Sequence, residues 1–499
     1  MRSVVRLTQP CGCRGARSIL SSIPRLLPPA LHIGPIVSAR RFAAFALLVA
    51  PLTAVAQQPA SVDPNQIDSI IRRNIADKHI IGVSVGIMQN GQVVFARGYG
   101  VANLASSTPV TPQTMFAIGS VTKQFTCSSM LMLQEKGKLS VDDPVSKYYP
   151  QLTRAKDITL KDLGGHLSGY RDYYPLDYVD REMARAEPAD TIITRYATRP
   201  LDFEPRSRWS YSNTGFLIIG RVIEKVSGEP IGTFFQTHIF TPLKLERTQY
   251  EPGPNGKDMA TGYTSFGLSD PIEAIPEAKG WAGAAGAIWS TPSDLLTWDR
   301  SLVNHTLISP SSYAVLTTPR RLTDGRSSGY GCGEGINDRG SAVTFSHGGA
   351  VSGFVAQNTI IPSTKSALVV LSNSDFSPVG ALNQELLAKL LPSADVPTVS
   401  GVSALDAAKK FLSDLELGRV DRSTISPDFD AYLTGDKLAA AQKSLSALGA
   451  ISNVRIVGVS ERGGLEVASV RFNVGATIAQ GLMYRRPDGK LEEFLFSRS

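Results

Sequence analysis

A serine and a lysine three positions apart are the first residues whose types and spacing suit chemistry. Ser120 and Lys123 open a run, residues 120–136, that contains no Gly or Pro and is followed by Gly137. This composition predicts a helix beginning at Ser120, on which the two side chains share one face. A serine hydroxyl needs a base to become a nucleophile, and a lysine can serve where its surroundings lower its pKa. The pair predicts Ser120 as nucleophile and Lys123 as its proton acceptor.

Two downstream segments support this pair, which alone would be a chance match in a chain of this length. In Tyr211-Ser212-Asn213 the phenol can exchange protons, and the amide can donate to a substrate carbonyl. The segment 346–350, Ser-His-Gly-Gly-Ala, follows a stretch typical of a strand. Its glycines allow a substrate backbone to approach closely.

In this order the three segments resemble the Ser-x-x-Lys, Tyr-x-Asn and Lys-Thr-Gly motifs of serine β-lactamases and penicillin-binding proteins, with the Tyr-x-Asn form of class C enzymes. The resemblance covers roughly residues 62–392 and includes residues 163–169, 282–301 and 369–373. It implies an α+β, β-lactamase/transpeptidase-like fold: an antiparallel sheet flanked by helices, with an all-helical subdomain.

The resemblance also implies roles for particular residues. Ser120 would form an acyl-enzyme while Lys123 and Tyr211 move protons, and Asn213 would hold the acyl group. Backbone N–H groups of Ser120 and Ala350 would bind the oxyanion, a contribution of roughly 3 kcal/mol per donor. The substrate-binding and oxyanion residues would thus be Asn213, His347, Gly349 and Ala350.

The third motif departs from the family pattern. His347-Gly348 stands where family members use Lys-Thr to bind a substrate carboxylate. A neutral imidazole binds a carboxylate less well than a lysine does. This departure favours esterases or peptidases acting on D-amino acids over a true β-lactamase. A non-catalytic penicillin-binding-like receptor or scaffold is the alternative, but retention of the serine, lysine, tyrosine and asparagine together argues against it.

The periodicity of the remaining chain predicts the elements that position these residues. A capped helix over residues 61–80 precedes a hairpin whose strands, 82–88 and 92–99, flank Asn90-Gly91. Further helices are expected at 217–226, 291–302 and 378–391, and strands at 342–345, 355–361 and 367–372. We expect a hydrolase domain over residues 57–392, a linker over 393–402 and a small α+β accessory domain over 403–499, with strands from Val454 onward.

The N-terminal 56 residues predict export. They contain seven arginines and no Asp or Glu, so they carry the whole net charge of +7. Arg40-Arg41, the apolar run 42–55 and a terminal Ala-Val-Ala are typical of a signal peptide cleaved after Ala56, behind a long N-terminal extension. A periplasmic or secreted protein is expected, with a mitochondrial location or an uncleaved membrane anchor as alternatives. The neutral remainder disfavours nucleic-acid binding, and no membrane span is expected after cleavage.

The cysteine and histidine counts argue against other chemistries. Cys11 and Cys13 fall in the removed segment, so a disulfide scaffold is not expected, and Cys127 is predicted to be a free, buried thiol. Six scattered histidines show no metal-binding spacing, so neither metal nor cofactor is expected. Ser327, in Gly-x-Ser-x-Gly, is rejected as a nucleophile because it lies in a predicted loop. The expected partner is a small-molecule or peptide substrate, and the sequence leaves the oligomeric state open.

Overall fold

The computed structural model describes residues 61–498 except 177, 254, 255, 257, 268, 340, 341 and 392–397. The predicted signal peptide and the first half of the predicted linker, residues 393–397, therefore lie outside the described residues. Among the described helices, none combines the length and apolar character needed to cross a bilayer.

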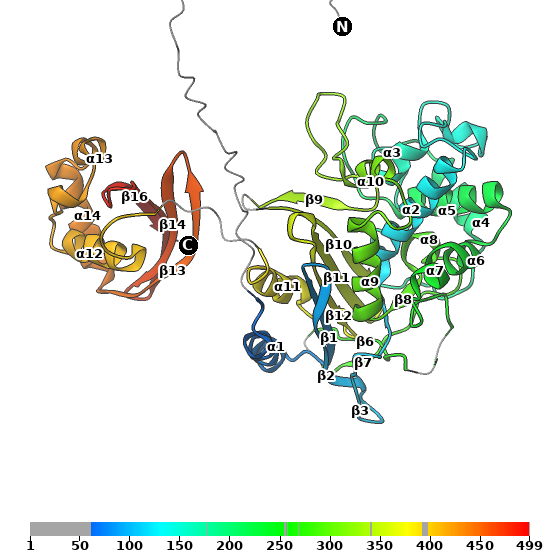
Figure 1. The fold of residues 1–499 in the computed structure, drawn as a ribbon, viewed down its shortest axis with the longest axis horizontal. Coiled ribbons are helices and arrows are strands. Elements are labelled where there is room, and N and C mark those ends of the chain that lie inside the picture. Colours follow the sequence, from blue (N-terminus) through cyan, green and yellow to red (C-terminus); the bar gives the residue numbers. More distant parts are fainter. Residues whose placement is uncertain are drawn as a thin grey trace, which may run out of the picture. The chain divides into compact units, whose positions relative to one another are not determined.

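An antiparallel seven-stranded sheet with the order β3-β2-β1-β12-β11-β10-β9 forms the framework (Figure 1). Its strands are β1 (Gly82–Gln89), β2 (Gln92–Asn103), β3 (Thr108–Pro109), β9 (Gly335–Asp338), β10 (Val343–Val351), β11 (Phe354–Ile361) and β12 (Ser366–Ser372). The predicted hairpin is confirmed, because Asn90 and Gly91 both adopt positive φ, 52° and 75°, between β1 and β2. Strand β1 pairs with β12, which joins the N-terminal hairpin to the last strands of the domain.

Helices cover both faces of this sheet (Figure 1). On one face lie α1 (Pro64–Lys78) and α11 (Val379–Leu387), whose isoleucines and leucines share a core with β1 and β12. Helix α1 begins as predicted, since Asp63 accepts a hydrogen bond from the backbone N–H of Asn65. On the other face α9 (Pro292–Val303) contacts β1 and β12.

A helical subdomain beyond α9 supplies most of the active-site residues. Its main members are α2 (Thr122–Glu135), α3 (Leu160–Gly164), α4 (Ala189–Ala197), α5 (Asn213–Ser227), α6 (Ile231–Phe235), α8 (Gly283–Gly286) and α10 (Pro310–Thr317). Helix α2 packs against α5 and α8. The fully buried Phe125 stacks on Trp298 of α9 with ring centroids 4.1 Å apart, which joins the subdomain to the helix that covers the sheet.

The C-terminal residues form a separate four-stranded sheet with its own core. It has the order β13-β14-β15-β16, from β13 (Ile451–Arg462), β14 (Leu465–Val474), β15 (Thr477–Arg485) and β16 (Leu491–Arg498). Helices α12 (Ala404–Glu416), α13 (Pro427–Tyr432) and α14 (Gly435–Leu448) contribute to that core, which includes Phe411, Phe472 and Phe494. The α+β composition predicted for this region is confirmed, while the domain boundaries stay predictions.

Two expected elements differ in detail from the structure. Ser120 does not open the α-helix: it lies in a 3-10 turn, Gly119–Val121, directly before α2. The third motif does not follow a strand, because β10 continues to Val351 and includes the whole of it. Glycines lower strand propensity, so local composition predicted too short a strand. Pairing of residues 345–351 with β11 overrides that tendency.

Candidate active site

The turn that carries Ser120 is fixed by glycine. Gly119 has φ of 50°, and a Cβ on it would lie 2.7 Å from the backbone nitrogen of Ala350. Only glycine fits a positive φ and so close an approach together. The turn therefore holds Ser120 against strand β10.

The structure brings the predicted nucleophile and its two predicted proton carriers together. Nζ of Lys123 and the hydroxyl oxygen of Tyr211 lie 2.8 Å and 2.7 Å from Oγ of Ser120. Tyr211 comes from the segment just before α5, 91 positions along the chain. Burial raises the pKa of Tyr211, so at neutral pH it is a phenol that donates to Ser120.

Lys123 is completely buried, and this burial lowers its pKa to about 7, against an opposing effect of the negative charge of Asp172. Nζ has two further partners at 2.8 Å, Oδ1 of Asn213 and the carbonyl oxygen of Ala285 in α8. Both partners can only accept. An uncharged amine has two N–H groups and one lone pair, so these acceptors take both N–H groups and leave the lone pair facing Ser120.

Strand β10 lies so close to the Ser120 turn that Gly349 leaves no room for a side chain. A Cβ on Gly349 would overlap the carbonyl oxygen of Ile118 and lie 3.2 Å from the backbone nitrogen of Ser120. The same atom on Gly348 would lie 3.3 Å from the side-chain oxygen of Gln357 and 3.9 Å from the carbonyl oxygen of Ala356, which is ordinary contact distance. Ala350 follows Gly349 in strand β10, opposite the turn that carries Ser120. The backbone nitrogens of Ser120 and Ala350 therefore lie on facing segments, as an oxyanion site requires.

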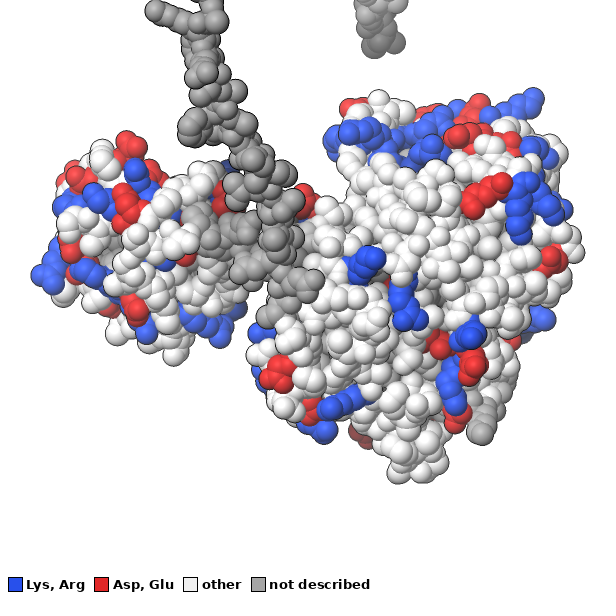
Figure 2. Space-filling view, in the orientation of Figure 1, with Lys and Arg blue, Asp and Glu red and all other residues white. Residues whose placement is uncertain are grey.

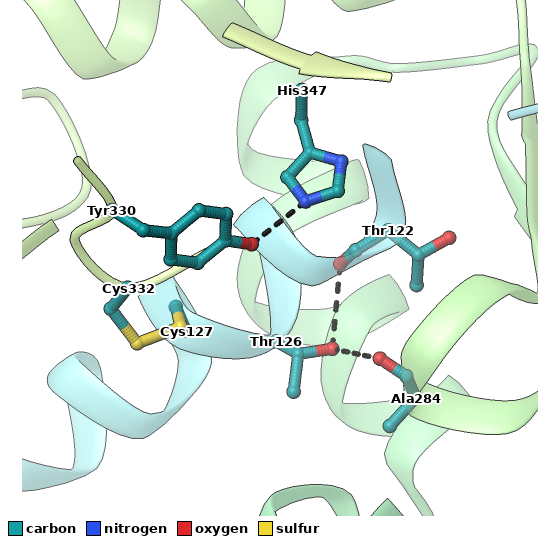
Figure 3. Close-up of a disulfide and its surroundings, with 7 residues drawn as sticks. All are labelled: Thr122, Thr126, Cys127, Ala284, Tyr330, Cys332 and His347. Atoms are coloured by element: carbon teal, nitrogen blue, oxygen red, sulfur yellow. Dashed lines mark hydrogen bonds between the residues drawn. A yellow bond between two sulfur atoms is a disulfide. The ribbon is translucent and has the colours of Figure 1, made fainter. Parts of the chain in front are cut away.

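His347 is buried and held neutral. Its Nε2 lies 2.7 Å from the hydroxyl of Tyr330 (Figure 3). Its Nδ1 lies 2.6 Å from the carbonyl oxygen of Gly348. Burial and the nearby Lys123 lower the pKa of His347 to about 3. The carbonyl accepts from Nδ1–H, so Nε2 accepts from Tyr330. With both ring nitrogens engaged, His347 offers neither charge nor a free donor to a substrate carboxylate.

His166 supports the tyrosine segment. Its Nδ1 accepts a hydrogen bond of 3.1 Å from the backbone N–H of Ser212, next to Tyr211. The ring packs among aromatic rings that include Tyr211 at 4.3 Å and Tyr330 at 4.8 Å. Burial lowers the pKa of His166 well below its usual value, so the ring is neutral.

A disulfide behind the site corrects the prediction of a free thiol at Cys127. Cys127, one turn after Lys123 in α2, is bonded to Cys332, 205 positions away (Figure 3). Both cysteines are buried, and a Cβ on Gly164 at the end of α3 would overlap Sγ of Cys332. The bond thus links the lysine helix to the segment that carries Tyr330. Sequence spacing could not reveal it, because the two cysteines meet only in the folded chain.

A cleft of about 1320 Å³ opens onto Ser120. Its described lining includes Tyr211, Asn213, residues 347–352 of β10 and its turn, and an apolar wall with Tyr173, Pro175, Leu176 and Phe376. Asp172, Asp202 and Asp375 also line it, whereas Arg171 is the one Lys or Arg among the described lining residues. Arg171 is paired with Asp202 at 2.8 Å. A bound carboxylate would therefore find no free cation among these residues.

Three other predictions can be set beside the structure. Ser327, the rejected alternative nucleophile, is exposed in an irregular loop without a following helix. Among the described residues no three His, Cys, Asp or Glu side chains converge as metal ligands would. The amide nitrogen of Asn213 faces Asp172 at 3.2 Å, so its predicted contact with substrate stays a prediction.

The fold and the site together define a serine hydrolase of the β-lactamase type. The Beta-lactamase family profile matches residues 67–391, about two thirds of the chain, and the chain belongs to this family. It is 28% identical over 343 residues to the protein PbpX of Bacillus subtilis, covering 66% of this chain and 82% of that protein.

A second relative is an aminopeptidase. The D-aminopeptidase of Gluconobacter oxydans is 30% identical over 300 residues, covering 58% of this chain and only 55% of that enzyme's length. Among solved structures, D-amino acid amidase from Ochrobactrum anthropi in complex with L-phenylalanine amide superposes with a TM-score of 0.58 at 23% identity, over 65% of this chain and 97% of that one. The amidase likeness confirms the transpeptidase-like fold.

Proposed function

We propose that this protein is an exported serine hydrolase that cleaves amide bonds of small substrates containing D-amino acids through an acyl-enzyme on Ser120. The observation that carries the proposal is the buried amine of Lys123, 2.8 Å from Oγ of Ser120 with a pKa of about 7. A base is most effective when its pKa is near the working pH. A scaffold protein would have no use for a lysine that must be kept uncharged in its interior.

The reaction follows from the positions of the side chains. Lys123 takes the hydroxyl proton as Oγ of Ser120 bonds to the substrate carbonyl carbon, and the oxyanion lies between the N–H groups of Ser120 and Ala350. The C–N bond then breaks, and the leaving amine receives a proton through Tyr211 or Lys123. Water attacks the resulting ester, releases the acid and returns the proton to Ser120, so the enzyme is regenerated.

The substrate class rests on the relatives and on the cleft. One relative is a D-aminopeptidase and one fold neighbour is a D-amino acid amidase. The neutral, fully engaged His347 and the paired Arg171 support substrates without a carboxylate beside the scissile bond. β-Lactams and carboxypeptidase substrates both carry such a carboxylate, so the proposal ranks them below amides and esters. The face in Figure 2 mixes Lys and Arg with Asp and Glu around uncharged areas, with no broad basic patch for a polyanion.

Export is part of the proposal, and the disulfide supports it. Stable disulfides form in oxidising compartments and are rare in the cytosol. The Cys127–Cys332 bond is buried and connects the helix of Lys123 to the segment of Tyr330, so folding of the site would benefit from such a compartment. This agrees with the expected signal peptide, which lies outside the described residues.

The test is hydrolysis of D-alanine p-nitroanilide and its L-isomer by the chain from Gln57 onward. We expect turnover of the D-isomer, its loss in Ser120→Ala, and little change in the matched serine variant Ser327→Ala. A short-chain p-nitrophenyl ester and a chromogenic cephalosporin are the comparison substrates. Faster turnover of the ester would make the protein an esterase. If no substrate reacted, the non-catalytic receptor would become the better interpretation.

A further inference from the structure

Asp172 is linked to the catalytic Lys123 by hydrogen bonds through Asn213. It lies in the segment between α3 and α4, is partly buried, and lines the cleft. One carboxylate oxygen accepts from the backbone N–H of Asn213 at 2.9 Å, and both oxygens lie near its amide nitrogen, at 3.2 and 3.3 Å. The backbone N–H of Tyr174 also donates to this carboxylate, at 3.2 Å. The carboxylate of Asp172 is thus fixed by a backbone N–H of its own loop and accepts hydrogen bonds from both the backbone and the side-chain amide of Asn213.

These hydrogen bonds fix the orientation of the side-chain amide of Asn213. A carboxylate can only accept hydrogen bonds, so the amide must present its NH₂ group to Asp172. Its oxygen then faces the opposite way, onto Nζ of Lys123 at 2.8 Å. With the reverse orientation, NH₂ would face the N–H groups of the lysine and the amide oxygen would face the carboxylate. Both contacts would be repulsive.

We infer that Asp172 is a positioning residue for the reaction: by holding the amide of Asn213, it makes Lys123 point its lone pair at Ser120. The inference rests on the proposed function. Asn213 and Ala285 must both accept N–H groups of the amine for the lone pair to face the hydroxyl. Ala285 is a backbone acceptor and needs no help, whereas the Asn213 amide is free to rotate unless something fixes it. Asp172 also places a negative charge beside the amine.

The charge and the geometry of Asp172 have separable consequences. Its charge raises the pKa of Lys123, against the larger effect of burial. The other titratable groups that face the amine are His166 and His347, both neutral, and the phenol of Tyr211. Asp172→Asn removes the charge but retains an acceptor for the backbone N–H of Asn213. Its side-chain amide carries an NH₂ group as well as an oxygen, so it no longer forces the amide of Asn213 to face one way. Asp172→Ala also removes the acceptor for the backbone. The pH midpoint therefore reports the loss of charge, and the rate at pH 8 reports the loss of orientation.

The experiment measures how fast a fluorophosphonate labels Ser120, by intact mass, between pH 5 and 10. This reagent reports the nucleophilicity of the serine without requiring the natural substrate. Wild type, Asp172→Asn, Asp172→Ala and the matched cleft variant Asp375→Asn are compared. Asp375 accepts from the backbone N–H of Gly353 at 3.2 Å and has no bond to Asn213. Thermal melts show that each variant is folded.

We expect labelling of Asp172→Asn to be at least about ten-fold slower at pH 8, with its acid limb moved to lower pH by roughly half a unit or more. Asp172→Ala should be slower still, and Asp375→Asn should keep the wild-type midpoint. Wild-type rate and midpoint in Asp172→Asn, or an equal shift in Asp375→Asn, would overturn the inference. If wild type is labelled but no D-amide is cleaved, only the substrate assignment fails. If folded wild type is not labelled, Ser120 is no nucleophile and the inference fails with it.

Discussion

At the scale of one residue, the burial of Lys123 makes it a base at neutral pH and also destabilises its charged form. A lysine normally ionises near pH 10.5, yet complete burial lowers the pKa of this one to about 7. The difference corresponds to roughly 5 kcal/mol that disfavours the charged form in the folded protein. The three contacts at 2.8 Å partly offset the loss of hydration and hold the amine in position. Below its folded pKa, protonation therefore both removes the base and strains the fold.

The pH dependence of unfolding tests this. Between pH 7 and about 10, Lys123 is neutral when folded and protonated when unfolded, so the unfolded state binds more protons and the free energy of unfolding rises with pH. Lys123→Met cannot show this rise. Chemical denaturation of both proteins across this range should show wild type gaining on the variant by several kcal/mol, with no gain below pH 6. A difference that stays constant with pH would mean that the amine is not desolvated as described.

At the scale of elements, catalysis depends on the contact between the Ser120 turn and strand β10. Gly119 lies in the turn and Gly349 in the strand, and neither position leaves room for a side chain. Gly348, the immediate neighbour, is exposed and less confined. The structure therefore distinguishes two adjacent glycines that look equivalent in the sequence.

Alanine at these neighbours should have very different effects. Gly349→Ala would force β10 away from the turn and separate the two oxyanion N–H groups, so kcat should fall by at least about 100-fold. Gly348→Ala would displace only the flexible end of Gln357, and kcat should change by less than about five-fold. Steady-state kinetics with whichever substrate proves active, beside circular dichroism of both variants, would measure this. Equal losses in the two folded variants would contradict the steric argument.

At the scale of the whole molecule, the disulfide and the proposed leader make a joint prediction. A full-length chain produced in a bacterium with an oxidising periplasm should be recovered from that compartment beginning at Gln57. Because Cys11 and Cys13 would be removed and the remaining pair is bonded, it should contain no free thiol. N-terminal sequencing and alkylation without reductant, read by mass, check both points. Alkylation of Cys127, or a product that still contains residues 1–56, would count against export.

Local patterns predicted much of this fold, because they reflect local forces. The turn at Asn90-Gly91, the helix after Asp63 and the convergence of Ser120, Lys123 and Tyr211 all followed from short-range spacing and the family resemblance. The Cys127–Cys332 bond, the contact of Asp172 with Asn213 and that of Tyr330 with His347 did not. Each joins segments whose proximity is set by the packing of other elements.

The short strand β9 leaves part of β10 without a partner next to the serine. It pairs only with residues 343–346 of β10, so on that side residues 347–351 have no strand partner among the described residues. An unpaired edge normally invites other proteins to add a strand. Here the open edge lines the cleft that contains Ser120 and Tyr211, so its backbone N–H and C=O groups are placed where an extended substrate backbone could pair with them. The end of β9 thus leaves the sheet one strand position unfilled beside the nucleophile.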